Sequence, residues 1–400
     1  MTGGEPVAVD RSALMQNYPE PVVTFVRGRG TELWDVAGRR YLDFLCGLAV
    51  TSLGHAHPKV AEALAEQART LLHVSNIFGT VVGPEVAVTI DTLVGDGTRA
   101  GGQVFFANSG AEANECAIKL ARRWAGPGRH VVVSAWDSFH GRTLATLTAT
   151  GQPAKHEPFR PLPEGFVHVP YDDLHAMEGA LAGTDVAAVL LEPILGESGV
   201  IAPSSDYLSG VRRLCDERGV LLVLDEVQTG LARTGRWFAF QHAELRPDVV
   251  TMAKALGNGV PIGACWARAE VAAAFGPGDH GSTFGGQPLA AAAARATLRV
   301  MQEIDAPGMA VRAGARLASG LAGLRGVTEV RGAGLLLGAA LAEPVAPVVA
   351  AAALERGLIV NAPRPDTIRL APPITVSDDE IDEAVAVLGD VLVSVLGSQA

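Results

Sequence analysis

The sequence predicts an α/β protein with a large domain built on a mostly parallel central sheet and a smaller α+β domain. Three observations lead to this prediction. The 400 residues suffice for two or three domains. After His57, compact apolar runs alternate with helical windows, which is typical of buried parallel strands joined by crossover helices. After Pro288, an alanine-rich helical stretch leads into a second strand-like region.

The elements follow in chain order. In residues 1–56, short apolar runs between turn residues predict small antiparallel strands at Val22–Val26, Leu33–Val36 and Tyr41–Leu45. Residues 57–289 form the large domain, with buried strands expected at Val104–Ala107, Val131–Ser134, Val186–Leu191, Val220–Leu224 and Val249–Met252. Residues 290–400 contain strand-like runs at 327–330 and 335–342 and a final amphipathic helix near 378–396. We assign residues 1–56 and 290–400 to the small domain and expect a continuous helix near residue 290.

Composition and charge exclude several classes of protein. Hydrophobic residues make up 48% of the chain and charged residues 19%, which is the balance of a globular protein. The net charge of −11 repels nucleic acid and anionic lipid, so we expect neither as a partner. Glu343, Pro344 and Pro347 interrupt the most apolar stretch, which therefore predicts no membrane span. The N-terminal stretch has no apolar signal core, so a cytoplasmic location is expected.

Cysteine and histidine spacing predicts no metal site. Cys46, Cys116, Cys215 and Cys265 match neither a zinc pattern nor a redox pair, and we expect buried thiols. His55 and His57 imitate a metal pair but have no third ligand nearby in the sequence. We interpret them as part of a structural turn before a helix that Pro58 opens.

Residues that follow the apolar runs are the candidates for chemistry, because open α/β sheets bind ligands beyond the carboxyl ends of their strands. Ser109, Gly110 and Ala111 follow one such run and open a helical window. Free N–H groups at a helix N-terminus attract an anion such as phosphate. The same residues also fit an ordinary helix cap with Glu112, so both interpretations stay open on this motif alone.

Asp225 directly follows the apolar run at 220–224. A carboxylate buried at that position requires a positively charged partner. Magnesium in a P-loop nucleotidase would meet that need, but such a loop requires a Gly-Lys pair. Each of the four lysines in the chain follows a residue other than glycine, which excludes this alternative. A dinucleotide fold is also disfavoured, because Gly332, Gly334 and Gly338 lie in a strand-like stretch without a following helix.

Lys254 is the candidate nucleophile. It follows the run Val249–Met252 and precedes a glycine-containing loop that permits close approach. A buried lysine loses proton affinity and can attack a carbonyl to form a Schiff base. The other lysines have solvent-facing interpretations: Lys59 at a polar helix start, Lys119 in a surface pair with Glu115, and Lys155 in a loop. An anion site, an acid and an amine are the three contacts that pyridoxal phosphate (PLP) requires.

The residues that carry these contacts belong to a longer series of motifs. In order, they are LWDVAGRRYLDFLCGLAVTSLGHAHP, NSGAEANE, FHGRT, LLEPILGESGV, LLVLDEVQTGLARTG, AKALGNGVPIG, GSTFGG and IRLAPPIT. In this series the chain resembles the class III, fold type I, PLP-dependent aminotransferases over Tyr18 to Pro373, and within that class the acetylornithine aminotransferases.

The resemblance implies site residues. It implies that Ser109, Gly110 and Ala111 contact the cofactor phosphate and that Phe139 stacks on the pyridine ring. It also implies that Asp225 pairs with the ring nitrogen, that Gln228 contacts the 3′ oxygen and that Lys254 forms the covalent link. Thr283 would reach the phosphate from the other subunit. Arg142 would bind the α-carboxylate of the donor, and Arg369 would bind the α-carboxylate of glutamate and 2-oxoglutarate. Glu197 would mask Arg369 while the first substrate is bound. Glu192 and His140 would support the cofactor pocket.

The resemblance also implies a function. It implies a cytoplasmic homodimer with sites at the subunit interface that transfers the distal amine of N²-acetyl-L-ornithine to 2-oxoglutarate, a step of arginine biosynthesis. Ornithine, succinyldiaminopimelate and 4-aminobutyrate are the alternative donors, and a non-catalytic binding protein of the same fold is the alternative from another class. Gln287, Asn258 and Ser198 depart from the residues usual in the family and bear on substrate preference.

Overall fold

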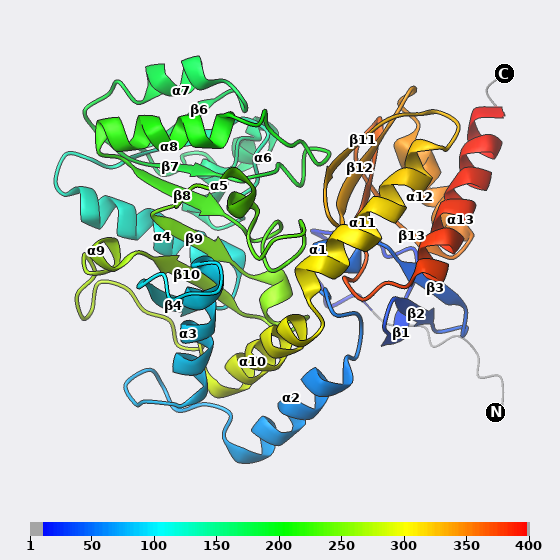
Figure 1. Ribbon diagram of the computed structural model, residues 1–400, viewed down its shortest axis with the longest axis horizontal. Coiled ribbons are helices and arrows are strands. Elements are labelled where there is room, and N and C mark those ends of the chain that lie inside the picture. The colour runs from blue at the N-terminus through cyan, green and yellow to red at the C-terminus, as the bar shows by residue number, and fades with distance from the viewer. Residues whose placement is uncertain (1–10, 398–400) are drawn as a thin grey trace.

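The computed structural model describes residues 11–397 and has two lobes (Figure 1). The larger lobe contains a seven-stranded sheet, and the smaller lobe contains two four-stranded sheets. Residues 1–10 and 398–400 lie outside the description, and with them part of the N-terminal stretch on which the cytoplasmic expectation rests. Within residues 11–397, no helix has both the length and the apolar character needed to cross a bilayer.

The central sheet of the larger lobe has the strand order β4-β10-β9-β8-β7-β5-β6. Its strands are β4 (Gln103–Ala107), β5 (Val131–Ala135), β6 (Phe166–Val169), β7 (Val186–Leu191), β8 (Leu221–Asp225), β9 (Val249–Met252) and β10 (Gly263–Ala267). Strands β9, β8, β7, β5 and β6 pair in parallel, whereas β10 pairs antiparallel with both β4 and β9. The predicted mostly parallel sheet is therefore confirmed.

Two strands of this sheet were not predicted, β6 and β10. Strand β6 lies at the edge of the sheet beside β5 and is half-exposed. An edge strand tolerates polar residues, and its sequence FVHV therefore lacks the continuous apolar run by which buried strands were predicted. Strand β10, GACWA, is fully buried but contains no β-branched residue, and its assignment depends on pairing with β4 and β9.

Successive residues of each central strand face two separate cores. Val132 and Val223 pack with helix α4 (Gly110–Ala125), whereas Val133 and Leu222 belong to the core on the other face. The other helices of this lobe are α2 (Pro58–Thr70), α3 (Val82–Val94), α5 (Leu144–Ala149), α6 (Pro153–His156), α7 (Leu174–Ala180), α8 (Tyr207–Arg218), α9 (Ala269–Ala272) and α10 (Pro288–Glu303). This double cover explains why the strands read as continuous apolar runs.

The smaller lobe combines both ends of the chain. One sheet has the order β1-β2-β3-β13, from β1 (Phe25–Arg29), β2 (Glu32–Asp35), β3 (Arg40–Asp43) and β13 (Leu358–Ile359), and the other has the order β11-β12-β15-β14, from β11 (Val327–Ala333), β12 (Leu336–Leu341), β14 (Asn361–Arg364) and β15 (Thr367–Leu370). Helices α11 (Ala306–Ala322), α12 (Ala346–Glu355) and α13 (Asp378–Gly397) accompany them, and the short α1 (Cys46–Ala49) follows β3. Strand β13 pairs in parallel with β3, so the N-terminal strands lie beside the C-terminal segment (Figure 1).

Some boundaries differ from the prediction. Strand β1 begins at Phe25 rather than Val22, because Phe25 already pairs with Asp35 at the end of β2, and Thr24 before it bonds to Val36, which lies beyond that strand. Helix α10 runs unbroken through residue 290 and packs on α2 and α3 of the larger lobe. The exact division into domains stays a prediction. All four cysteines are buried free thiols, as expected.

Candidate active site

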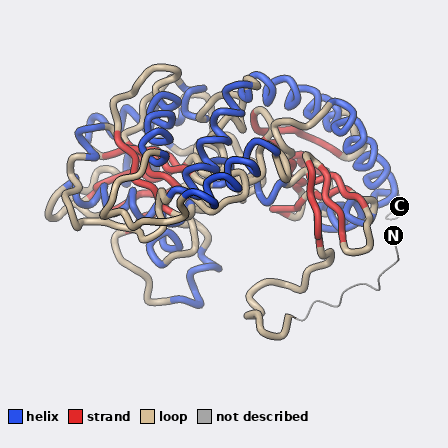
Figure 2. The backbone as a smooth tube through the Cα atoms, turned by 90° about the horizontal axis from the view of Figure 1, so that it is seen from below, coloured by secondary structure: helices blue, strands red, loops and turns tan. Residues whose placement is uncertain are grey.

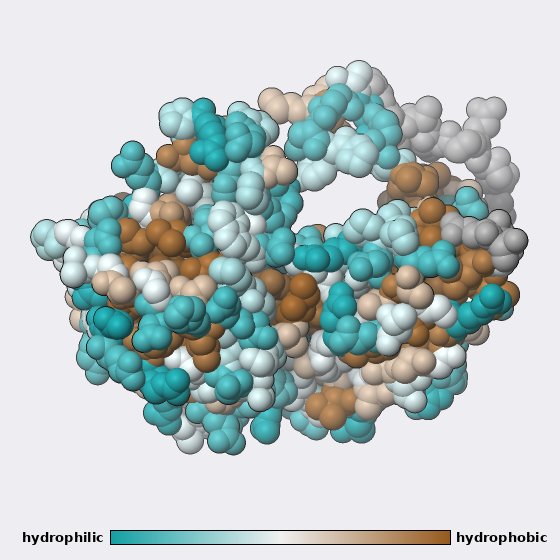
Figure 3. All heavy atoms as spheres, turned by 90° about the horizontal axis from the view of Figure 1, so that it is seen from above, coloured by the Kyte–Doolittle hydropathy of each residue, from teal (hydrophilic) through white to brown (hydrophobic). Residues whose placement is uncertain are grey.

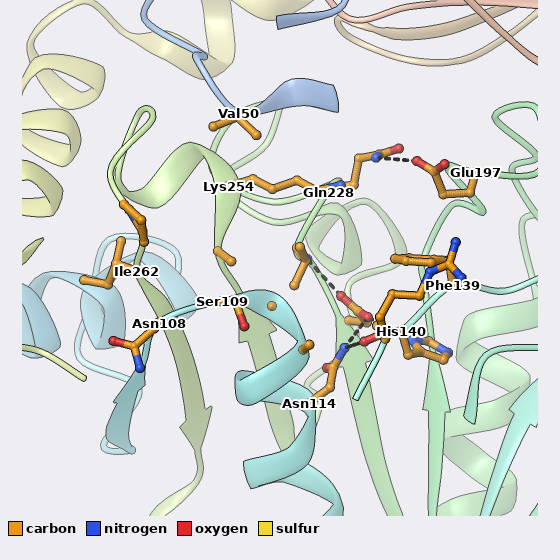
Figure 4. A pocket seen from close by; sticks show the side chains of 18 of the residues that line it. Val50, Asn108, Ser109, Asn114, Phe139, His140, Glu197, Gln228, Lys254 and Ile262 are labelled. Carbon is orange, nitrogen blue, oxygen red and sulfur yellow. Dashed lines mark hydrogen bonds and ion pairs between the residues drawn. The ribbon is translucent and has the colours of Figure 1, made fainter. Parts of the chain in front are cut away.

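A cavity of about 400 Å³ lies at the carboxyl ends of β4, β8 and β9 and at the N-terminus of α4. Most of the predicted site residues line it: Ser109, Gly110, Ala111, Phe139, Arg142, Glu197, Asp225, Gln228 and Lys254. Figure 4 shows Lys254, Ser109 and Phe139 facing this space from three different segments of the chain. This is the position at which open α/β sheets bind ligands.

Ser109 caps helix α4 and leaves part of its N-terminus available. The Ser109 hydroxyl accepts a hydrogen bond from Glu112 N at 3.2 Å, while the Glu112 carboxylate accepts from Asn108 N at 2.9 Å. The cap uses the third N–H of the helix, and Gly110 and Ala111 before it line the cavity. The cap and the anion site are therefore compatible, because the positive end of a long helix opens onto the cavity.

Asp225 is held by donors from two other segments. Its Oδ2 atom accepts from Asn114 Nδ2 at 2.7 Å and from His140 Nδ1 at 2.8 Å, and its Oδ1 atom accepts from Val227 N at 3.1 Å (Figure 4). The sequence analysis did not select Asn114, which lies on α4 one turn beyond Ala111 and lines the cavity. These bonds fix the orientation of the carboxylate at the end of β8.

Glu192 is a second buried carboxylate of the cavity wall. It accepts hydrogen bonds from Phe139 N at 2.8 Å and Gly196 N at 3.2 Å, and so joins the loop after β5 to the loop after β7. Burial raises the pKa of Glu192 to about 7. The imidazole of His140 lies behind Asp225, and its Nε2 atom is buried without a partner within residues 11–397.

Lys254 extends into the cavity from a strained turn. Its φ of 41° lies in the left-handed region, which residues other than glycine and asparagine rarely adopt. Lys254 begins the short 3₁₀ turn Lys254–Leu256. Its amine is buried, and the Glu197, Glu192 and Asp225 carboxylates are near enough to favour its charged form. Burial lowers the pKa of Lys254 from its ordinary value, which favours the uncharged amine.

Asn258, one of the departures from the family pattern, has a structural explanation. It replaces a frequent glycine at a position with φ of 47°, which asparagine tolerates better than most residues. Its side chain accepts from Leu53 N at 2.8 Å and donates to Gly54 O at 3.2 Å. Asn258 thus ties the loop after Lys254 to the N-terminal segment.

The buried Arg369 and the partly exposed Glu197 form an ion pair beside the cavity. The Arg369 side chain is 1% exposed and donates from Nη1 to Glu197 Oε1 at 2.7 Å and to Gly196 O at 2.9 Å. Its Nη2 atom is buried without a partner among the described residues. Burial would raise the pKa of Glu197, but the Arg369 guanidinium outweighs burial and holds that pKa below its ordinary value.

Arg142 is the exposed counterpart of Arg369. It lines the cavity, and its guanidinium carbon lies 5.7 Å from the centre of the Phe139 ring. Thr283 does not line the cavity; it is exposed in a separate hollow that also includes Asn108 and Phe284. The proposed role of Thr283 across a subunit interface stays a prediction.

Two expectations about lysines were wrong. Lys119 does not pair with Glu115; its amine donates to Asp279 O at 3.0 Å, because α4 packs near the loop before residue 280. Lys155 lies in helix α6 rather than in a loop, and it is half-buried with its amine bonded to the Gln152 side chain. Pro153 at the first position of α6 favours the helix start and explains the difference.

Comparison with known proteins identifies the fold family. The profile of Aminotransferase class-III matches residues 14–392. The chain belongs to the class III aminotransferases. It is 50% identical to the acetylornithine aminotransferase of Corynebacterium efficiens over 384 residues, covering 95% of this chain and 94% of that protein.

Solved structures agree with this assignment. The ornithine aminotransferase of Toxoplasma gondii, with PLP at partial occupancy in its active site, superposes with a TM-score of 0.91 at 35% identity, covering 97% of this chain and 94% of that one. The N-acetylornithine aminotransferase of Stenotrophomonas maltophilia superposes with a TM-score of 0.82 at 36% identity, covering 95% and 98%. Class III aminotransferases depend on PLP, and this chain is accordingly a PLP-dependent transaminase of fold type I.

The cavity fits PLP on its own chemistry. Its donors and acceptors comprise a helix N-terminus for an anion, a fixed carboxylate and a buried amine. Its volume of about 400 Å³ lies in the usual range for a small-molecule site.

Proposed function

We propose that the chain transfers the distal amino group of N²-acetyl-L-ornithine to 2-oxoglutarate, giving N-acetyl-L-glutamate 5-semialdehyde and L-glutamate. The observation that carries this proposal is the placement of two guanidinium groups: Arg142 is exposed and lines the cavity, and Arg369 is buried behind Glu197, which also lines it. The relatives named acetylornithine aminotransferase at 50% and 48% identity support the choice of donor.

The cofactor would be held by residues of the larger lobe. The N-terminus of α4, from Ser109 to Ala111, would bind the phosphate, and Phe139 would cover the ring. Asp225 would accept a hydrogen bond from the protonated ring nitrogen, with Asn114 and His140 holding the carboxylate in place. Gln228 would contact the ring oxygen, and Lys254 would supply the covalent link.

Bound PLP supplies an electron sink for negative charge that develops at the carbon next to the reacting amine. The residues of the chain would control where protons move. Lys254 would act as general base and acid once the substrate amine has displaced it, and the direction of its pKa shift favours the uncharged form that a base requires. Asp225 would keep the ring nitrogen protonated through an ion pair.

The two arginines would select which amine reacts. A donor with its α-carboxylate on Arg142 presents its distal amine to the cofactor, while Glu197 covers Arg369. Glutamate and 2-oxoglutarate would instead bind Arg369 through their α-carboxylate after Glu197 has left it. A planar guanidinium is suited to both tasks because it binds a carboxylate with two parallel hydrogen bonds.

We also propose a cytoplasmic homodimer with Thr283 reaching the partner's cofactor. Ile77, Phe78 and Val81 are exposed by 85%, 69% and 72%, and Phe284, next to Thr283, is 64% exposed. Asn76 Nδ2 donates to Ser282 O at 2.8 Å, so these apolar side chains and Thr283 belong to one surface. Residues 11–24, the described part of the segment before β1, also loop away from the body and leave an open gap, as Figures 2 and 3 show from opposite sides. The exposed apolar surface formed by Ile77, Phe78, Val81 and Phe284 is typical of a protein interface.

A donor panel tests the function. Half-reactions of the PLP-loaded protein with N²-acetylornithine, ornithine, succinyldiaminopimelate and 4-aminobutyrate are followed by the loss of the visible absorbance of the cofactor, with Lys254→Ala as the inactive control. We expect the highest kcat/KM with N²-acetylornithine. A higher kcat/KM with free ornithine would overturn the proposed donor, and a protein that stays colourless and inert with PLP would favour the binding-protein alternative.

A further inference from the structure

Glu197 lies between two hollows. It lines the main cavity, and it also lines an adjoining hollow of about 420 Å³ together with Gln152, Ser198 and Arg364. If Arg369 binds a substrate carboxylate, as the proposed function requires, the Glu197 carboxylate must leave Arg369. The Glu197 side chain is 29% exposed, so a displaced carboxylate is only partly solvated and is stabilised by a new cationic partner.

The adjoining hollow provides a cation for such a carboxylate. Arg364, in β14, is 39% exposed, and its ion pair among the described residues is with Asp137, at 3.2 Å from Nη2 to Oδ2. The Asp137 side chain is itself 61% exposed, so this pair is weakly held. A Cβ on Gly199 would lie 3.4 Å from Arg364 Cδ, so the stem of Arg364 passes beside the loop that carries Glu197.

The backbone around Glu197 is fixed on both sides. The Ser198 hydroxyl donates to Asp137 O, and Arg331 Nε donates to Gly199 O at 2.8 Å. Leu195 and Ile201 exchange hydrogen bonds of 2.9 and 3.1 Å, which close the loop at its base. With the backbone held in this way, Glu197 changes partner by rotation of its side chain. Ser198, one of the departures from the family pattern, therefore helps to fix the backbone next to Glu197.

We infer that Arg364 receives the Glu197 carboxylate whenever a substrate carboxylate occupies Arg369, so that the adjoining hollow is the second resting place of this side chain. The inference rests on the proposed function of Arg369. Arg364 has five donors and can hold Asp137 and Glu197 together. Arg364 is therefore a positioning residue that strengthens the binding of dicarboxylates without touching them.

A double-mutant cycle on the PLP-loaded enzyme tests this inference. Isothermal titration calorimetry measures the Kd of glutarate, which carries two carboxylates but no reacting group, for wild type, Arg364→Gln, Glu197→Ala and the double variant. We expect Arg364→Gln to raise the Kd by about twofold to fivefold in the wild-type background, the range of one partly exposed ion pair. In the Glu197→Ala background, the same substitution should leave the Kd unchanged, because no carboxylate remains to be received.

Matched variants separate this effect from a general loss of positive charge. Arg364→Lys keeps the charge and should restore most of the affinity. Arg316→Gln removes one positive charge from α11, where Arg316 pairs with Asp382, and should leave the Kd unchanged. An equal rise of the Kd on Arg364→Gln in both backgrounds, or no rise in the wild-type background, overturns the inference.

Steady-state kinetics distinguish this inference from the proposed function. In Arg364→Gln, the KM for 2-oxoglutarate should rise by the same factor as the glutarate Kd, while the KM for the donor stays constant. If the enzyme transaminates its donor but the cycle shows no coupling, the inference fails and the function stands. If no donor reacts but the cycle shows coupling, the proposed function fails and the movement of Glu197 stands.

Discussion

Glu226 allows the cost of a buried carboxylate to be measured outside the cavity. It follows Asp225, is 1% exposed, and accepts hydrogen bonds from Phe240 N at 2.9 Å and from the Thr229 hydroxyl. Burial raises the pKa of Glu226 from 4.5 to about 7. Because Glu226 does not line the cavity, its replacement leaves the proposed chemistry in place.

The raised pKa makes stability depend on pH with a definite sign. The folded protein holds this proton more tightly than the unfolded chain, so the contribution of Glu226 is most favourable below the unfolded pKa and is lost as the pH rises through about 7. At about 1.4 kcal/mol per pKa unit, the loss is on the order of 3 kcal/mol.

Glu226→Gln removes this dependence while keeping an oxygen for Phe240 N. We expect the variant to be more stable than wild type by about 1–3 kcal/mol at pH 8 and nearly equal to it at pH 4, below the unfolded pKa. Urea unfolding at both pH values measures the difference, and Glu62→Gln on the exposed face of α2 is the matched control. An advantage of equal size at both pH values, or none at pH 8, would refute the argument from burial.

Three further predictions concern the cavity. Lys254→Ala should abolish the visible band of covalently bound PLP and lower turnover by about 10²–10⁴-fold, and a wild-type spectrum would contradict the assignment of Lys254. Arg142→Ala should raise the donor KM by about 10–100-fold, the value of a charged hydrogen-bonded contact, and leave the KM for 2-oxoglutarate nearly constant; equal effects on both would refute its role. Asn258→Ala should cost about 2 kcal/mol in urea unfolding, since it loses two hydrogen bonds and disfavours the left-handed φ, whereas Asn258→Gly should cost less; the reverse order would show that φ is not the cause.

The local pattern of the sequence was sufficient for most of the larger lobe. Strands β7 and β9 begin and end at the predicted residues, because strands covered on both faces are apolar at every position. The prediction failed where pairing decides the structure. Strand β10 is defined by its neighbours β4 and β9, and the start of β1 is defined by the end of β2.

The candidate site shows the same division. Ser109, Asp225 and Lys254 could be chosen from the sequence, because each comes just after an apolar run, where its polar side chain is unusual. Asn114 could not, because its importance comes from the distance of its amide to Asp225, a residue far along the chain. Lys119 was misassigned for the same reason, since its true partner belongs to a loop that only folding brings near.

The sequence by itself determined the α/β class, the strands buried on both faces, the family and the chemical groups that PLP requires, since these depend on residue type and local order. The tertiary structure decided which groups meet: Asn114 and His140 on Asp225, Glu197 on Arg369, and Arg364 beside the second hollow. The physical reason is that hydrogen bonds and ion pairs depend on distances of a few ångströms between residues far apart in the chain, and local periodicity carries no information about those distances.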